Sequence, residues 1–370
     1  LDAIVAPQQM VQELASLAAA VEKATGTAAP DHLRGLLEQV EVDARQLELA
    51  ERLQGSDKSL CLLGQFAMAH PQAAALRALA RYVADATGGS CNLLTQGGNA
   101  TGAWLAGAVP HRGPGGSRTA GGANAQQMLD SAHQAYLLWG IEPDYDCGNP
   151  AAAMQVLEQA EAVIAVASFA TDSLRQVADL ILPLAPHAEG EGSLMNFDGT
   201  TQAFAPAAKA QGEARPGWKI LRRLGSALGL SGFEQVGLAD VQSDLQRAVQ
   251  GAEQEGAVTV PNLAAPDTHA GLYRIGEVAM YSVDALCRRA GPLQETQQAR
   301  SGFVALNPAD AERLGVAEGE PVRVSQGGEP AELEVEVSER VPAGGVWLRS
   351  ATCVTRMLGH AVAPVVVEKA

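Results

Sequence analysis

The sequence has few aromatic residues and few basic ones. Aromatic residues make up 4% of its 370 residues, and 26 lysines and arginines stand against 42 aspartates and glutamates. The formal net charge of −16 repels phosphate backbones and anionic lipid headgroups. We therefore expect no nucleic-acid partner.

Long hydrophobic runs are also missing. The longest, around residues 162–170, has the length of a strand and not the ~20 residues that span a bilayer, so we expect no direct membrane insertion. No basic segment with an apolar run follows Leu1, so no signal peptide is expected. Because that residue is not Met, the chain is expected to be a trimmed piece of a longer protein.

Cysteine motifs and the common catalytic motifs are absent from the sequence. The cysteines are dispersed, with none in a C-x-x-C pair or at ligand spacing from a histidine; they are Cys61, Cys91, Cys147, Cys287 and Cys353. No local zinc or iron–sulfur site is expected, and reduced thiols in a cytosolic compartment fit this pattern. A Gly-Lys dipeptide, G-x-S-x-G and H-E-x-x-H are missing too, which argues against a P-loop, a hydrolase elbow and a zinc protease.

The hydrophobic pattern predicts an α/β fold. Residues 1–58 read as a helical N-terminal segment, with Asp31 as a candidate N-cap. Short apolar strands then alternate with single helices, at residues 59–64, 91–95, 135–140, 162–168 and 179–184. This alternation is typical of a parallel sheet covered on both faces. We predict a doubly wound, mainly parallel sheet flanked by helices over residues 59–250.

The residue pattern changes after residue 250. Residues 251–300 are mixed and turn-rich, and we expect them to be a connecting segment. From residue 301 short strands alternate polar and apolar residues, with one brief helix capped by Asn307 and a hairpin turn at SQGGEP. We therefore predict a separate, small, mainly-β barrel domain of the double-psi type over residues 301–370.

Two segments are candidates for chemistry. The glycine-rich stretch 96–122 follows a strand at the edge where open α/β sheets bind ligands, and Arg112 and Arg118 could meet an anion. Its glycine spacing and the lack of a following helix make it a poor dinucleotide fingerprint, so an extended surface loop, or a loop buried against a partner, is favoured. Asn99 lies in a glycosylation sequon that carries little weight in a cytosolic chain.

The other candidate segment is the acidic, glycine-rich run 181–204, which follows a proline-terminated strand. Clustered carboxylates push each other's pKa values apart, so Glu189, Glu191 and Asp198 could act as acid and base, with His187 as a partner. No lysine or metal motif defines such a role. Solvated loop carboxylates are the favoured interpretation.

Several motifs resemble one known family. The stretch ADLILPLAPHAEGEGSLMNFDGTTQAF resembles a segment of the molybdopterin oxidoreductase superfamily, and ALNPADAERLGVAEGEPVRV resembles its C-terminal dinucleotide-binding barrel. PHRGPGG, GEARPGWKILRRLGSALGL and MYSVDALCRRAGPLQET are similar to one branch, the large peripheral-arm (G) subunit of the proton-translocating NADH-quinone oxidoreductase, or respiratory complex I. The resemblance covers residues 59–370. Thr200 stands where the superfamily commonly has arginine, so a cation for an anionic group is missing.

The resemblance implies a structural role. In that branch, iron–sulfur clusters lie in an N-terminal region whose cysteine motifs are missing here, so the chain would be a non-redox C-terminal portion. Molybdopterin is not expected, and no catalytic, cofactor-binding or metal-binding residue is assigned. The implied partners are other peripheral-arm subunits of complex I, on the cytoplasmic side of the inner membrane as part of a membrane-bound complex.

Two alternatives stay open at this point. The chain could be a fragment of a catalytic molybdenum or tungsten oxidoreductase that uses a pterin cofactor. It could also be a free-standing nucleotide-binding protein that uses the 96–122 stretch. Ferredoxin-type cysteine spacings in the upstream sequence would favour the complex I branch over the first of these alternatives.

Overall fold

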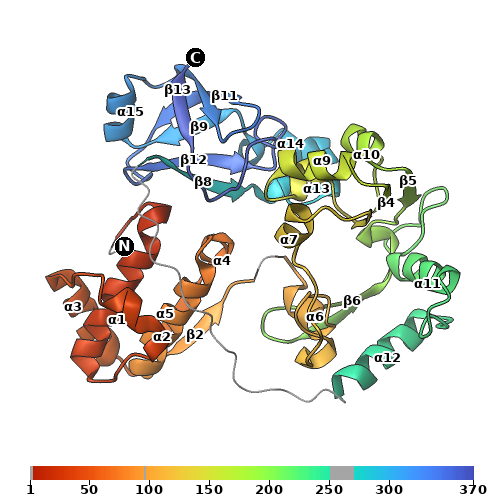
Figure 1. Ribbon diagram of the computed structural model, residues 1–370, viewed down its shortest axis with the longest axis horizontal. Helices are drawn as coiled ribbons and strands as arrows, with labels where there is room; N and C mark the ends of the chain where they lie inside the picture. The colour runs from red at the N-terminus through yellow and green to blue at the C-terminus, as the bar shows by residue number, and fades with distance from the viewer. Residues whose placement is uncertain (1–2, 96, 251–270) are drawn as a thin grey trace. The chain divides into compact units, whose positions relative to one another are not determined.

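The computed structural model describes residues 3–95, 97–250 and 271–370, which fall into two compact units. The first unit contains residues 3–95, 271–279 and 301–370, and the second contains 97–250 and 280–300. Figure 1 shows the chain coloured from its N-terminus to its C-terminus. The chain enters the second unit twice, because residues 280–300 leave the first unit and residues from 301 return to it.

Helices dominate the N-terminal part of the first unit. A 3₁₀ turn, η1 (Pro7–Gln9), leads into α1 (Met10–Thr25), followed by α2 (Asp31–Leu37) and α3 (Ala44–Gln54). Gly26 ends α1 with φ 71°, a left-handed conformation that glycine adopts without strain. Pro30 holds the N-cap position of α2 and Asp31 is the first helical residue, so the predicted cap was one residue out of place.

A two-stranded parallel sheet shares the core of these helices. The elements are β1 (Leu60–Leu63), α4 (Gln65–Ala69), α5 (Ala73–Ala86) and β2 (Ser90–Leu93). Helix α1 packs against both α3 and α5 (Figure 1). Val21 of α1, Leu63 of β1 and Leu79 of α5 belong to one hydrophobic cluster. The expected boundary between residues 58 and 59 therefore falls inside a single core.

The rest of the first unit is a six-stranded sheet that curls into half a barrel (Figure 1). Its strands are β8 (Tyr273–Val278), β9 (Phe303–Leu306), β10 (Pro321–Ser325), β11 (Ala331–Val337), β12 (Gly345–Ser350) and β13 (Val366–Lys369), in the order β13-β10-β11-β9-β12-β8. Helix α15 (Pro308–Leu314) follows β9, and the Asn307 side chain caps it as predicted. The predicted hairpin between β10 and β11 is antiparallel, and the mainly-β, barrel-like character of this part is confirmed, although its sheet also includes β8, which precedes residue 301.

Strand β8 differs from the sequence prediction. We expected residues 251–300 to be a connecting segment; residues 251–270 lie outside the described residues, but 273–278 pair in parallel with β12. The buried Arg274 side chain fixes this strand. Its guanidinium donates hydrogen bonds to Gln326 Oε1, Gly359 O and Ser350 Oγ at 2.8–2.9 Å. Burial lowers the pKa of Arg274 to about 10.

The second unit contains a three-stranded parallel sheet, β3-β4-β5. Its strands are β3 (Ala135–Trp139), β4 (Ala162–Ala167) and β5 (Leu180–Pro183), with α9 (Pro150–Glu158) and α10 (Asp172–Val177) in the connections. The predicted caps are confirmed, because the Asn149 and Thr171 side chains accept hydrogen bonds from the first turns of α9 and α10. Two short helices, α7 (Ala125–Asp130) and α8 (Pro143–Asp146), flank β3.

The remaining elements of the second unit lie outside the β3-β4-β5 sheet and its connections. They are α6 (Ala100–Leu105), η2 (Pro114–Gly116), η3 (His187–Glu189), the hairpin β6 (Gly192–Met195) and β7 (Thr201–Phe204), α11 (Gly217–Ala227), α12 (Leu238–Gln250), η4 (Met280–Ser282), α13 (Ala285–Arg289), α14 (Gly291–Gln294) and η5 (Gln297–Ala299). Among the described residues, no helix is long and apolar enough to span a bilayer.

The α/β class with parallel sheets and a barrel domain is confirmed, but the five predicted strands do not share one sheet. Strands β1 and β2 pair with each other in the first unit, and β3, β4 and β5 pair in the second. The chain passes from β1 to β2 through α4 and α5, from β3 to β4 through α8 and α9, and from β4 to β5 through α10 alone. The long segment between β2 and β3 contains α6 and α7 instead of a single crossover helix.

Gly276 offers a test of the barrel packing. A Cβ atom at this position would lie 2.6 Å from the Ala361 carbonyl oxygen, so Gly276→Ala forces the 361 segment to move. We expect a loss of about 1–3 kcal/mol in the free energy of unfolding, measured by denaturant titration. Gly35→Ala in α2 is the matched control, because nothing lies within 4 Å of its Cβ position. Equal stability of the two variants would contradict the close contact.

Candidate functional site

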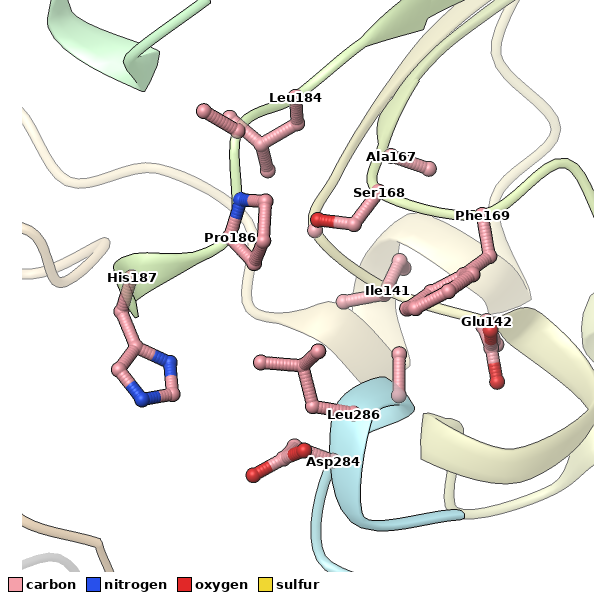
Figure 2. Close-up of a pocket in the computed structure, with 13 residues that line it drawn as sticks. Ile141, Glu142, Ala167, Ser168, Phe169, Leu184, Pro186, His187, Asp284 and Leu286 are labelled. Carbon is pink, nitrogen blue, oxygen red and sulfur yellow. The ribbon is translucent and has the colours of Figure 1, made fainter. Parts of the chain in front are cut away.

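A pocket of about 190 Å³ lies at the carboxyl ends of β3, β4 and β5. Three segments that directly follow these strands line it, together with the start of α13: residues 140–142, 167–169, 184–187 and 284–286. In Figure 2, Leu286 points from α13 into the pocket, with Asp284 and His187 on one side and Phe169 and Glu142 on the other. This is the edge at which open parallel sheets bind ligands.

Buried charges hold α13 at this edge. The Glu142 side chain is 3% exposed and the Arg288 side chain 8%, and their Oε2 and Nε atoms are 3.1 Å apart. Arg288 also binds Asp146 at 2.9 Å and donates to the Ser282 carbonyl oxygen at 3.0 Å. Arg289 approaches the other oxygen of Glu142 at 2.7 Å. Partners of opposite charge offset part of the cost of taking such groups out of water.

Aromatic rings complete the cluster around the two arginines. The Arg288 guanidinium lies 4.8 Å from the ring centre of Tyr145, and that of Arg289 lies 4.4 Å from the ring centre of Phe169. These cation–π contacts add to the ion pairs and orient both guanidinium planes. The arginine–carboxylate cluster of Glu142, Asp146, Arg288 and Arg289 therefore links the end of β3 to a segment about 146 residues further along the chain.

Asp284 caps α13 at the mouth of the pocket. Its Oδ1 accepts a hydrogen bond from the Cys287 backbone N–H at 2.8 Å. Burial raises the pKa of the Asp284 carboxyl group, but hydrogen bonds from the backbone and thiol of Cys287 and the nearby His187 lower it more. The pKa therefore lies below its ordinary value, and the carboxylate is ionised at neutral pH.

Residues 97–122, the described part of the glycine-rich stretch, are folded on themselves, so the prediction of an extended loop without a helix is wrong. Helix α6 begins at Ala100. A Cβ atom on Gly116 would lie only 2.7 Å from the ring of Trp104 in this helix. A Cβ on Gly107 would meet the Gly113 backbone at 2.5 Å. These glycines allow the chain to approach itself. The backbones of the two candidate arginines, Arg112 and Arg118, pair in an isolated bridge.

The acidic run 181–204 forms the hairpin β6–β7 instead of a loop. Asp198 and Asn196 both accept a hydrogen bond from the Thr200 backbone N–H, at 2.9 and 2.8 Å. Hydrogen bonding to Thr200 lowers the pKa of Asp198, which therefore acts as a turn-forming carboxylate. Asn99 accepts from the Met195 backbone at 2.8 Å, so the sequon asparagine anchors this hairpin.

The other candidates in this run are spread apart. Glu189 accepts a long hydrogen bond of 3.2 Å from the Gln211 backbone, and Glu191 is exposed. His187 is the one member of the proposed acid–base set that lines the pocket. Its charged neighbour there is Asp284, which sequence reasoning did not single out.

The sequence model of the molybdopterin oxidoreductase family matches residues 18–227, more than half of the chain. The chain belongs to the molybdopterin oxidoreductase family. A second model, the molydopterin dinucleotide binding domain, matches residues 287–356. The two matches together include both the pocket-lining ends of β3, β4 and β5 and the arginines of α13.

Curated relatives of this family member are distant. The alpha subunit of an NADPH-Fe(3+) oxidoreductase from Geobacter sulfurreducens is 25% identical over 283 residues, which cover 68% of this chain and 32% of the relative. The G subunit of NADH-quinone oxidoreductase from Mycobacterium bovis is 26% identical over 305 residues, which cover 74% of this chain and 36% of the relative. The chain thus spans about a third of the length of these relatives.

Among solved structures, acetylene hydratase from Pelobacter acetylenicus superposes with a TM-score of 0.60 at 13% identity. The match covers 97% of this chain and 70% of that chain. At this identity the likeness concerns the fold alone. The match extends over both the α/β elements and the barrel strands of this chain.

The pocket does not fit the pterin dinucleotide cofactor that the family name implies. Its volume of about 190 Å³ is below the ~300 Å³ of ordinary ligand sites, and a dinucleotide is larger still. Of the thirteen described residues that line it, His187 alone has a basic side chain, while Glu142 and Asp284 are acidic. The nearby guanidinium groups of Arg288 and Arg289 are paired with carboxylates. Phosphate groups would meet more negative than positive charge.

Sequence reasoning missed the cluster, although two signals were present. The run EPDYD lies just beyond the end of β3, and the motif CRRAG supplies the arginines. The first was not singled out, and the second was used only as a family marker. Opposite charges in two such runs indicate a contact only when their places in the fold are known. That contact lies across more than 140 residues of chain.

Arg288→Leu tests whether the cluster holds α13. It leaves Asp146 without its ion pair and reduces the partners of buried Glu142, so we expect a loss of about 3–5 kcal/mol in the free energy of unfolding. Arg247→Leu is the matched control, because the Arg247–Asp244 pair is 74% and 41% exposed and is worth at most about 1 kcal/mol. Denaturant titrations that give the two variants equal stability would show that the cluster carries little energy.

Proposed function

We propose that the chain is the structural, non-redox portion of a protein related to the G subunit of NADH-quinone oxidoreductase. Electron transfer in such a protein would be carried by iron–sulfur clusters outside this chain. The alignment with the G subunit over 74% of the chain supports this proposal, as do the branch motifs around residues 110–116, 212–230 and 280–296.

The observation that carries the proposal is the arginine–carboxylate cluster at the carboxyl edge of the β3-β4-β5 sheet. In a ligand-binding sheet, basic groups at this edge are available to an anionic ligand. Here Arg288 and Arg289 pair with Glu142 and Asp146 of the same chain. A molybdopterin cofactor is therefore not expected to bind, and the sheet would serve as a scaffold.

The proposed partners are other subunits of the peripheral arm of such a complex. The net charge of −16 disfavours nucleic acid and anionic membranes, and it suits docking to basic protein surfaces. The chain would then act at the cytoplasmic side of the inner membrane, held there by its complex.

A second candidate follows from the Geobacter relative. The chain aligns with the alpha subunit of the NADPH-Fe(3+) oxidoreductase at nearly the same identity, so a scaffold role in an NADPH-dependent complex is the alternative. A catalytic molybdopterin-dependent oxidoreductase is less well supported, because the pocket offers phosphate groups little positive charge. Cofactor content separates the scaffold roles from the catalytic one.

Elemental analysis of the purified chain tests the absence of a redox group. We expect far less than one atom of molybdenum, tungsten or iron per chain, because among the described residues no cluster of three metal-ligating side chains exists. The visible spectrum should lack iron–sulfur absorption. A stoichiometric amount of any of these metals, retained after dialysis against a chelator, would refute the non-redox role.

The complex that contains the chain allows a test of the scaffold role itself. Arg288→Leu should lower the amount of assembled complex, while NADH oxidation per assembled complex should stay within about twofold of the wild type, since turnover depends on groups elsewhere. His187→Ala is the matched pocket variant, because this exposed side chain lines the pocket outside the cluster. It should change neither quantity. A large loss of turnover at normal assembly would instead indicate chemistry in the pocket.

A further inference from the structure

Two cysteines face each other across the small parallel sheet of the first unit. Cys61 of β1 and Cys91 of β2 are direct partners in the strand register. Neighbouring strands lie about 4.8 Å apart, which is within the Cα separation of about 4.4–6.8 Å found in disulfides. Backbone spacing therefore allows a bond between them.

The two side chains also point the same way. Residues in register on neighbouring strands share one face of the sheet, and both cysteines pack against the hydrophobic core of α1, α2 and α5. Burial raises the pKa of the Cys61 thiol to about 11, and the neighbouring Cys91, within hydrogen-bonding reach, raises it as well. Both residues keep part of their surface accessible.

We propose that Cys61 and Cys91 form a redox-active dithiol that small disulfides such as oxidised glutathione convert to an intramolecular disulfide. Because the raised pKa leaves little Cys61 thiolate at pH 8.5, the first attack on the glutathione disulfide comes from Cys91, which forms a mixed disulfide and releases one glutathione. The second cysteine attacks the mixed disulfide and releases the other glutathione. The two thiols together lose two electrons and two protons, and oxidised glutathione takes them up as two reduced molecules.

The cross-link acts on a small sheet. It has two strands in the part of the chain that the structure describes, and helix α5 packs against both of them. Side chains in register on parallel strands lie somewhat further apart than the Cβ atoms of a relaxed disulfide, so the bond brings the strands together under strain. Strained disulfides are reduced readily. The modification is therefore reversible by thiols.

The other three cysteines provide the controls. Cys147 follows α8, Cys287 is on α13, and Cys353 is exposed in the segment after β12; none is opposite another cysteine in a described strand pair. A variant with serine at these three positions keeps only the pair. Trypsin separates the pair, because cleavage after Lys58, Arg77, Arg81 and Arg112 gives one peptide for each cysteine.

The experiment treats the whole chain and the triple-serine variant with excess oxidised glutathione at pH 8.5. We expect the variant to lose both thiols and about 2 Da in mass, because two hydrogens leave with the bond. Mass spectrometry should find the 59–77 and 82–112 peptides linked, and dithiothreitol should separate them. Cys61→Ser and Cys91→Ser should each retain a single thiol or a glutathione adduct, with no internal link.

Three outcomes would overturn the proposal. The variant could keep both thiols titratable in the folded state while losing them in urea, which would show that the folded sheet prevents the reaction. It could stop at a stable glutathione adduct on each cysteine, which would show that the two sulfur atoms cannot meet. It could form links only between chains, separable on a non-reducing gel.

Discussion

The arrangement of the second unit depends on the buried ion pair between Glu142 and Arg288. Glu142 lies just beyond the end of β3, and its carboxylate would be left in a largely apolar site if α13 were elsewhere. Because a buried charge without a partner costs several kcal/mol, the position of α13 is bound to the end of β3. The position of Leu286 depends on this pairing too, because α13 carries its side chain into the pocket between the strand ends. One electrostatic requirement thus decides what fills the carboxyl edge of the sheet.

The same pairing bears on the misfit between the pocket and the anionic cofactor that the family name implies. Open parallel sheets present polar groups at their carboxyl edge, and these groups need partners. Here the acidic run 142–146 supplies negative charge and Arg288 and Arg289 supply positive charge from the same chain. The charged groups at this edge are therefore paired with one another within the chain. The small volume left over is consistent with this pairing.

Local features of the fold were predictable from the sequence, and long-range pairings were not. The caps at Asn149, Thr171 and Asn307 depend on residues within one turn, so the sequence carries the full signal. The division of the parallel strands between two sheets depends on which strand edges meet, which an apolar run of four to six residues does not encode. Strand β8 was missed for the same reason, since its partner β12 lies about seventy residues further along the chain. The hairpin β6–β7 was hidden because its turn, with Gly199 at φ 88°, lies in a run read as polar loop.

The buried arginine of the first unit, Arg274, has different partners from Arg288 of the second unit. Arg288 is neutralised by carboxylates, whereas the hydrogen bonds of Arg274 go to neutral oxygens of Gln326, Gly359 and Ser350. The lowered pKa of Arg274 shows that burial works against its charge, and among the described residues its Nε atom has no hydrogen-bond partner. What the guanidinium provides instead is geometry, because its fork joins β8 to the β10–β11 turn and to the segment before β13. In both units, therefore, a buried arginine fixes the position of a segment distant in the sequence. The carboxylates of the second unit make that attachment the stronger of the two, since hydrogen bonds between two charged groups are stronger than those to neutral acceptors.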